Sequence, residues 1–339
     1  MRRFLSLFTL SVLICACTAA PVTNSVEDVF IDLSKRDKPE AITQNPWNEV
    51  VINVELFEDI APLFTEIGGF ETIDKTKNHW ILGARGAEGS FVRLVEIGEA
   101  DPARPATSRS WDKGCYFSVM MRAKDLPSII EDAAPLGWTP LTEMAYLEFG
   151  QSKLNIIVLT HKTGVRVQLY ERLNRPIPEG FTPFERLSRP FNIMQMVEDR
   201  DASYDFFQQG LGFDTFFYGK PYRSEIEEVM PLGIPPKLTT TIPYKTAIVA
   251  PKAGLEYGRM EMIDIEDMEG SIDYAPRCNH DHTGIVEIRF DVPDLDKTRQ
   301  DLVGRGLEFQ PVKAKTGADF IRLKSPDGSN IAFHQAPKL

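Results

Sequence analysis

The stretch GIVEIRFDVPDLDKTRQDLVGRGLEF, residues 284–309, contains the pattern that decides the fold. From Val286 to Val292 apolar side chains alternate with polar ones, which is the period of a strand with one buried face. Asp294 follows in a position that caps a helix, Gly304 is placed to end that helix, and an apolar run then opens a second strand. The stretch therefore predicts a strand–helix–strand unit.

The same unit recurs three times upstream. An alternating strand, a helical run and a glycine follow one another over 50–70, 117–138 and 191–213. Each copy precedes a strand-rich region, so each is typical of a βαβββ module. Four such modules predict an α+β protein with an internally repeated fold.

Length and charge narrow the class of protein. The chain has 339 residues, which is enough for about two domains of ~150 residues each. Hydrophobic residues make up 42% of the chain, a share that supports a sizeable core. The net charge of −11 argues against a nucleic-acid partner, because phosphate binding requires a clustered basic surface.

Residues 1–16 have the pattern of a targeting signal. Two arginines precede an apolar run of roughly a dozen residues, which is too short to span a bilayer of ~30 Å. The run ends at Cys17 in a way that resembles the bacterial lipoprotein signal, in which a small residue precedes the lipidated cysteine. We therefore expect Cys17 to carry a lipid, with 17–45 as a flexible tether and the folded part on the periplasmic side of a bacterial membrane. A plain secretory signal cut near Ala20 and an uncleaved anchor are the alternatives.

Four short motifs accompany the modules. They are VPDLDKTRQDLVGRGLEF (292–309), SPDGSNIAF (325–333), GLGF (210–213) and GVRVQLYE (164–171). With them, the chain resembles the vicinal oxygen chelate superfamily, also called glyoxalase/bleomycin-resistance-like, over nearly all of 46–336. In this superfamily two modules pair into an open eight-stranded barrel with a concave site. Four modules then imply two such domains, which we place at 46–173 and 190–336, joined by a proline-rich linker at 174–189.

Strand phase predicts which side chains line each concave site. Helices must bury the apolar face of a strand, so the alternate face lies toward the cup. In the strand quoted first, that face carries Glu287, Arg289 and Asp291. The corresponding positions in other first and last strands are Glu49, Asn53, Arg93, Ser118, Arg122, Arg166, Gln168, Tyr170, Asn192, Met194, Met196, Glu261, Ala332 and His334.

The resemblance also implies where a metal would bind, because metal-dependent members take ligands from the first and last strands of each module. In the N-terminal half these positions include Arg93, which repels a cation, so no metal is expected there. In the C-terminal half these positions include Glu261, Glu287 and Asn192. This oxygen-rich set could bind a divalent metal ion, so a metal site there stays an open alternative. The two histidines and one glutamate of an iron dioxygenase are absent from these positions, so extradiol chemistry is not expected.

Glu261 and Glu287 are the candidate catalytic pair, with His334 one pleat further along. Paired carboxylates can separate into an acid and a base when burial raises one pKa, which suits proton abstraction next to a carbonyl. The alternative is that Glu287 forms an ion pair on a solvated strand face. The candidate substrate contacts in this C-terminal cup are Asn192, Arg289 and Met194.

The N-terminal half offers a second set of substrate contacts. Arg93, Arg166 and Gln168 suggest a cationic cup that can hold a carboxylate through bidentate contacts. The alternative is that Arg93 pairs across strands with Glu49. For Met194 in the other half, contact with an apolar ligand and packing in a domain interface are equally open.

Three further features stay outside this chemistry. An oxidising compartment would permit a disulfide between Cys115 and Cys278, but nothing in their spacing requires one. The run 278–282 contains residue types that ligate metals, yet no distant second cluster completes four ligands, so we interpret it as a solvated loop. An insertion at 222–236, with a short helix expected over 225–230, is placed where a lid would form.

We therefore predict an exported glyoxalase-like protein that acts on a small carbonyl- or carboxylate-bearing molecule. The expected chemistry is proton transfer of the lyase or isomerase kind in the C-terminal cup. The alternatives are a non-catalytic protein that sequesters a small molecule, as bleomycin-resistance-like members do, and a structural module. Neither the substrate nor the oligomeric state follows from the sequence.

Overall fold

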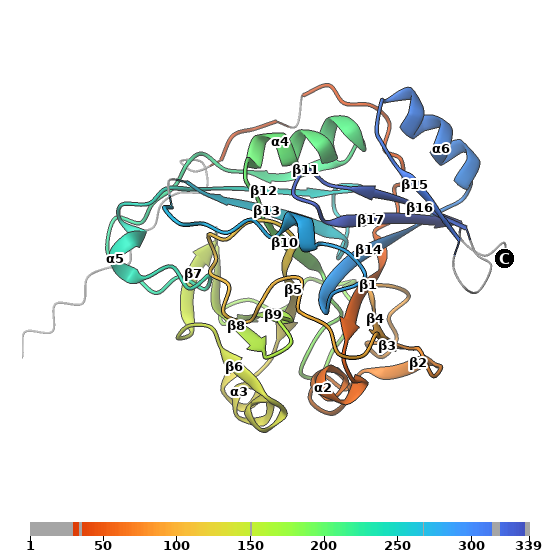
Figure 1. Ribbon diagram of the computed structural model, residues 1–339. Helices are drawn as coiled ribbons and strands as arrows, with labels where there is room; N and C mark the ends of the chain where they lie inside the picture. Colours follow the sequence, from red (N-terminus) through yellow and green to blue (C-terminus); the bar gives the residue numbers. More distant parts are fainter. Residues whose placement is uncertain (1–29, 34–35, 150, 267, 314–318, 336–339) are drawn as a thin grey trace, which may run out of the picture.

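The computed structural model describes residues 30–33, 36–149, 151–266, 268–313 and 319–335. They form four modules in which a strand and a helix precede further strands (Figure 1). The first module contains β1 (Trp47–Val54), α2 (Phe57–Pro62), β2 (Glu71–Lys75), β3 (His79–Gly83) and β4 (Phe91–Glu96). The second contains β5 (Tyr116–Ala123), α3 (Leu126–Ala133), β6 (Trp138–Pro140), β7 (Ala145–Phe149), β8 (Ser152–His161) and β9 (Arg166–Arg172).

The other two modules follow the same order. The third contains β10 (Asn192–Met196), α4 (Arg200–Asp205), β11 (Asp214–Tyr218), α5 (Pro236–Thr239), β12 (Tyr244–Ala250) and β13 (Arg259–Ile265). The fourth contains β14 (Gly284–Val292), α6 (Leu295–Gly304), β15 (Gln310–Lys313), β16 (Asp319–Lys324) and β17 (Asn330–Gln335). The α+β fold class and the repeated module are therefore confirmed.

The strand at the start of the fourth module has the predicted phase. Val286, Ile288 and Phe290 are buried, and the last two belong to the main hydrophobic core. Asp294 caps α6, because its carboxylate accepts a hydrogen bond from the backbone N–H of Lys297 at 2.9 Å. Burial of these apolar side chains under the helices is what leaves the opposite face of the strand for a site.

The modules pair differently from the prediction. One sheet has the order β15-β16-β17-β14-β1-β4-β3-β2, so its eight strands join the fourth module to the first. The other runs β11-β12-β13-β10-β5-β9-β8-β6, with β7 added beside β8, so its nine strands join the second module to the third. The predicted domains 46–173 and 190–336 were therefore wrong as paired units. Alternation along a strand indicates its buried face and carries no information about which strand lies beside it.

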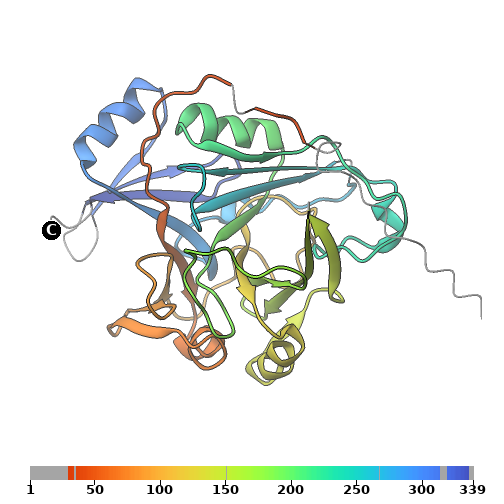
Figure 2. The same ribbon diagram turned by 180° about the vertical axis from the view of Figure 1, so that it is seen from behind.

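Each sheet carries one helix from each of its two modules, α2 and α6 on the eight-stranded sheet and α3 and α4 on the nine-stranded sheet. Figures 1 and 2 show α4 and α6 together on one side of the molecule and α2 and α3 on the other. Neither sheet closes into a barrel, because the outermost strands of each do not pair with one another. Each sheet therefore keeps one face free of helices, and this face can hold a site.

A disulfide joins the two sheets. Cys115 directly precedes β5 of the nine-stranded sheet, and Cys278 lies in the loop that leads into β14 of the eight-stranded sheet. Their Cα atoms are 5.2 Å apart and the bond spans 163 residues of sequence. The spacing of the two cysteines gave no reason to expect the bond, because the pairing of the modules is what brings them together.

The segment 36–45 packs across the helices of both sheets. Arg36 forms an ion pair with Asp205 of α4 at 2.7 Å. At the end of α6, Arg305 donates a hydrogen bond to the backbone carbonyl of Glu40 at 2.7 Å. Figure 2 shows the chain passing between α4 and α6 before it enters β1.

The prediction of a flexible tether over 17–45 was therefore wrong for the part that the structure describes. Polar composition suggested a leash, but backbone groups and charged ends of this segment find partners on the helices. Cys17 and the rest of the predicted signal lie outside the described residues. No helix in the described part of the chain is long and apolar enough to cross a membrane.

Candidate functional site

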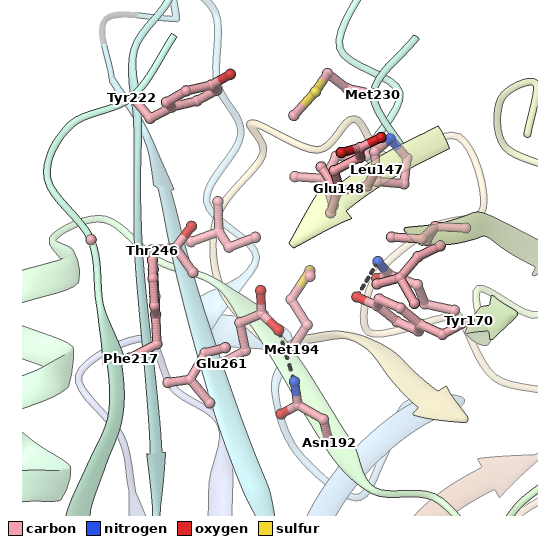
Figure 3. Close-up of a pocket in the computed structure, with 18 of the residues that line it drawn as sticks. Leu147, Glu148, Tyr170, Asn192, Met194, Phe217, Tyr222, Met230, Thr246 and Glu261 are labelled. Atoms are coloured by element: carbon pink, nitrogen blue, oxygen red, sulfur yellow. Dashed lines mark hydrogen bonds between the residues drawn. The ribbon is translucent and has the colours of Figure 1, made fainter. Parts of the chain in front are cut away.

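A cavity of about 700 Å³ lies on the concave face of the nine-stranded sheet (Figure 3). Its floor comes from β5, β9, β10 and β13, which belong to the second and third modules. The hairpin strand β7 and the insertion at 222–236 wall it in, as expected for a lid, although the helix predicted over 225–230 is absent. Most lining side chains are apolar, and a few polar groups converge on the floor, which is the usual composition of a small-molecule site.

Glu261 is the acidic group on the cavity floor. Its carboxylate Oε2 accepts a hydrogen bond from Asn192 Nδ2 at 2.7 Å. Burial raises the pKa of Glu261 to about 7, although the Asn192 hydrogen bond and the charge of Arg259 act in the opposite direction. Near neutral pH this carboxyl group can therefore both accept and return a proton.

A phenol lies across the floor from this carboxylate. Tyr170 Oη accepts a hydrogen bond from Gln168 Nε2 at 2.8 Å (Figure 3). Burial, together with the charge of Glu261, raises the pKa of Tyr170 well above its usual value, so the phenol keeps its proton at neutral pH. Its hydroxyl contacts Met120 Sδ at 3.7 Å, a weak acceptor that a ligand oxygen would replace.

Two further groups on the floor face the same space. Asn192 Oδ1 is buried and has no hydrogen-bond partner among the described residues. Figure 3 shows Met194 between Glu261 and Tyr170, so the side chain lies in the cavity. Met194 also belongs to a small hydrophobic core together with Met196, so its position is compatible with both interpretations left open for it, ligand contact and interface packing.

Glu287 is on the other sheet and does not share a cup with Glu261. It is fully buried and pairs with Arg289 at 2.6 Å, with Arg322 at 2.5 Å and with His280 at 3.1 Å. Burial favours the neutral form, but the hydrogen bond from His280 and the neighbouring arginine charges outweigh it and hold the pKa of Glu287 well below its usual range. The predicted catalytic pair was therefore wrong. The alternative of an ion pair with Arg289 is confirmed, but the solvated strand face that it assumed is wrong, because Glu287 is fully buried.

The rest of the eight-stranded sheet's concave face is filled by the same kind of contact. Arg93 makes a bidentate pair with Glu49, with both N···O distances at 2.7 Å. Arg289 also reaches Glu49 at 3.3 Å. The pairing alternative for Arg93 is confirmed, and Arg93 and Arg289 are engaged by carboxylates of the chain itself instead of a substrate.

Two other candidates lie away from the cavity. Arg166 is buried and donates to the backbone carbonyls of Ala106 at 3.1 Å and Ser108 at 2.7 Å, so it holds a loop. His334 lies 2.5 Å from Asp291, its neighbour across β17 and β14 of the eight-stranded sheet, whereas Glu261 is on the other sheet. The predictions of Arg166 and His334 as site residues were therefore wrong. Strand phase gives the face on which a side chain lies, but the part of that face beyond the cavity contacts loops and neighbouring strands instead of a ligand.

Comparisons with known proteins place this architecture. No protein-family model and no curated protein matches the sequence. Among solved structures, glyoxalase I from Zea mays has a TM-score of 0.57 at 13% identity, over 86% of this chain and 92% of that chain. The chain has the glyoxalase fold. A putative dioxygenase from Bacillus subtilis subsp. subtilis str. 168 shares it, with a TM-score of 0.54 at 12% identity over 89% of this chain and 87% of that chain.

The glyoxalase fold raises the question of a metal, and the side chains that the structure describes do not fit one. In the described residues no group of three or more His, Cys, Asp or Glu side chains is arranged around a common point. The joint site predicted for Glu261 and Glu287 is wrong, because they lie on different sheets. Beside Glu261 the positive charge of Arg259 would repel a cation, and Asn192 presents an N–H donor to the carboxylate where a metal ligand would present oxygen.

Arg172 and Arg259 escaped the sequence-based selection, whereas Arg122 was predicted on the cup face and does line the cavity. Arg122, Arg172 and Arg259 line the same cavity in this version of the glyoxalase fold. Arg172 lies two residues after Tyr170 on β9, and Arg259 lies two residues before Glu261 on β13. Period-two phase alone could have found them, and no local motif singles them out.

Proposed function

We propose that the protein acts on a small carbonyl-bearing organic molecule by proton transfer, with Glu261 as the base. The observation that carries the proposal is a buried carboxyl group, with a pKa of about 7, facing a cavity of about 700 Å³. A general base works best when its pKa lies near the operating pH. Burial at the centre of an apolar cavity supplies that condition here.

The proposed step balances without an added reactant. Glu261 takes a proton from the carbon next to the carbonyl, and the C–H electron pair moves into the enolate. The Tyr170 hydroxyl donates a hydrogen bond to the enolate oxygen, while Gln168 fixes the direction of that hydroxyl by donating to it. Glu261 then returns the proton to the same or a neighbouring carbon. Asn192 orients the carboxylate throughout.

Hydrogen–deuterium exchange tests this step without knowledge of the product. A panel of ketones and keto acids is incubated with the protein in D₂O, and NMR follows loss of hydrogen at the carbon next to the carbonyl. We expect exchange above the uncatalysed rate, and a loss of about 100-fold or more in Glu261→Gln, which is typical for removal of a general base. Glu179→Gln, in the exposed linker, is the matched control. Equal exchange in wild type and Glu261→Gln would refute the role of Glu261.

Binding without turnover is the second candidate function. It is favoured by the mainly apolar lining of the cavity, which suits retention of a small organic molecule. In that case a panel member raises the melting temperature of wild type and Glu261→Gln alike and shows no exchange in either.

We further propose that the protein is exported and anchored to a membrane through a lipid on Cys17. The signal-like residues 1–16 support export. A disulfide between Cys115 and Cys278 also supports an oxidising compartment, since such bonds are rare where thiols are kept reduced. The anchor would be the only contact with the membrane.

A further inference from the structure

Three arginines gather at one end of the cavity. Arg122 on β5 neighbours Tyr170 on β9, and Arg172 lies two residues further along β9 on the same face. Arg259 on β13 neighbours Asn192 on β10. Because β5 and β10 pair directly, these strand ends meet, and all three arginine side chains line the cavity.

Among the described residues, no carboxylate lies in ion-pair contact with this cluster, although the charges of Glu261 and Glu256 act on Arg259 and Arg122 from further away. None of the three arginines forms an ion pair within the described part of the chain, and Arg122 and Arg259 donate only to the backbone carbonyls of Glu256 (3.4 Å) and Leu255 (3.2 Å). The Glu256 carboxylate is already bound by Arg189. Burial, followed by the like charge of Arg259, lowers the pKa of Arg122 to about 10, so the guanidinium stays charged at neutral pH. A half-buried group of cations without counter-charges in contact is the arrangement that an anionic ligand would complete.

Aromatic rings hold two of these guanidinium groups, those of Arg122 and Arg259, in place. The Arg122 guanidinium carbon lies 4.4 Å from the centre of the Phe191 ring and 4.9 Å from that of Phe181. That of Arg259 lies 4.1 Å from the Phe216 ring. Contacts of this kind restrain the arginine side chains before a ligand arrives, and the same rings give the cavity flat apolar walls.

We propose that Arg122, Arg172 and Arg259 form a subsite for the anionic group of the ligand, so that the substrate is an organic anion with a flat apolar body. Guanidinium groups suit carboxylate and phosphate alike, through paired N–H donors. Arg259 and Glu261 lie two residues apart on one strand face, on the order of 7 Å. The anionic group and the carbon that loses its proton are therefore several bonds apart. This last step rests on the proposed function of Glu261, whereas the charge requirement does not.

The remaining carboxylates of the lining do not neutralise the cluster. They are Glu148, Glu225 and Glu228, from β7 and the insertion. Glu148 accepts a hydrogen bond from Tyr146 at 2.6 Å and lies 3.3 Å from Lys153. Figure 3 shows Glu148 across the cavity from Asn192, which is the register partner of Arg259. The cavity therefore has a direction, and an anionic ligand enters with its charged group toward the arginines.

Matched ligands test the subsite through binding alone. The probes are aryl ketones with a terminal carboxylate, such as 5-oxo-5-phenylpentanoate, and their terminal carboxamides, measured by titration calorimetry. We expect wild type to bind the carboxylates about tenfold or more tightly than the carboxamides. Arg172→Gln and Arg259→Gln should each weaken carboxylate binding by about 10- to 100-fold and change carboxamide binding by about twofold or less. Retained carboxamide binding shows that the variants are folded.

The control and the contrary outcomes are equally specific. Arg299→Gln, on α6 of the other sheet, should bind both probes as wild type does. Absence of carboxylate binding, equal affinity for both probes, or equal losses for both in the variants would overturn the subsite. If the arginine-dependent preference holds but wild type shows no exchange, the proposed function fails and the subsite stands. If neutral ketones exchange as fast as carboxylates, also in the arginine variants, the subsite fails and the proposed function stands.

Discussion

Replacement of Glu261 by glutamine should stabilise the folded protein at alkaline pH and have no such effect in acid. Burial raises the pKa of Glu261 from the ordinary 4.5 to about 7, so the folded state holds a proton that the unfolded chain releases. A carboxyl group with a raised pKa favours folding below pH 4.5 and loses this contribution as pH rises through 7. The full change corresponds to about 3 kcal/mol. Glutamine mimics the protonated form and can still accept the hydrogen bond from Asn192.

Urea unfolding at a series of pH values measures this effect. The difference in unfolding free energy between Glu261→Gln and wild type should be smallest near pH 4 and grow to about 3 kcal/mol in favour of the variant by pH 8. Glu179→Gln, an exposed control, should show no such pH dependence. A difference that stays constant with pH, or that favours wild type at pH 8, would refute the claim that burial disfavours the ionised carboxylate of Glu261.

Three other outcomes follow from the structure. Replacing Cys115 and Cys278 by serine should lower the unfolding free energy by about 2–5 kcal/mol in urea titrations, because the bond closes a long loop; an unchanged value would contradict its role between the sheets. Gly212→Ala should cost about 2 kcal/mol or more in the same assay, because φ is +77° there and a Cβ would lie 2.5 Å from the Glu40 carbonyl oxygen. Cys17→Ser should move the protein from the membrane to the soluble fraction of cells, and continued partition with membranes would argue against lipidation.

The alternation of side chains was enough to predict the fold class and the orientation of its strands. In β14 the apolar side chains at Ile288 and Phe290 are buried as the period of two requires, and Glu287 lies on the opposite face. The neighbour of each module was beyond such reasoning. Every module offers similar strand edges, and only the contacts made in three dimensions, such as the pairing of β1 with β14, select the first and fourth modules as partners.

The candidate site shows the same division. Asn192, Met194 and Glu261 were expected together and line one cavity, because they sit on the paired strands β10 and β13 of a single module. Gln168 was assigned to a different cup and joins them, because β5 pairs with β10. Glu287 lies outside the cavity for the same reason, because its strand β14 belongs to the other sheet. The predicted faces of these residues were thus correct, but the wrong pairing of modules assigned some of them to the wrong cup.

The ion-pair partners of the charged side chains could not be predicted from the sequence either. Glu49 and Arg93 are far from Arg289 in sequence, yet they meet on the eight-stranded sheet and neutralise one another. The arginines of the nine-stranded sheet find no such partners among the described residues. Whether a charged side chain is satisfied by the protein or left for a ligand depends on long-range contacts, which a single sequence does not reveal.

A crystal structure of the protein with a bound aryl ketone carboxylate tests the central claim most directly. The account predicts the ligand on the concave face of the nine-stranded sheet, with its carboxylate toward Arg259 and the carbon beside its carbonyl facing Glu261. The carbonyl oxygen should lie within hydrogen-bond distance of the Tyr170 hydroxyl. A ligand seated beside Glu287 on the eight-stranded sheet, or one in the cavity that leaves Glu261 without contact, would contradict the account.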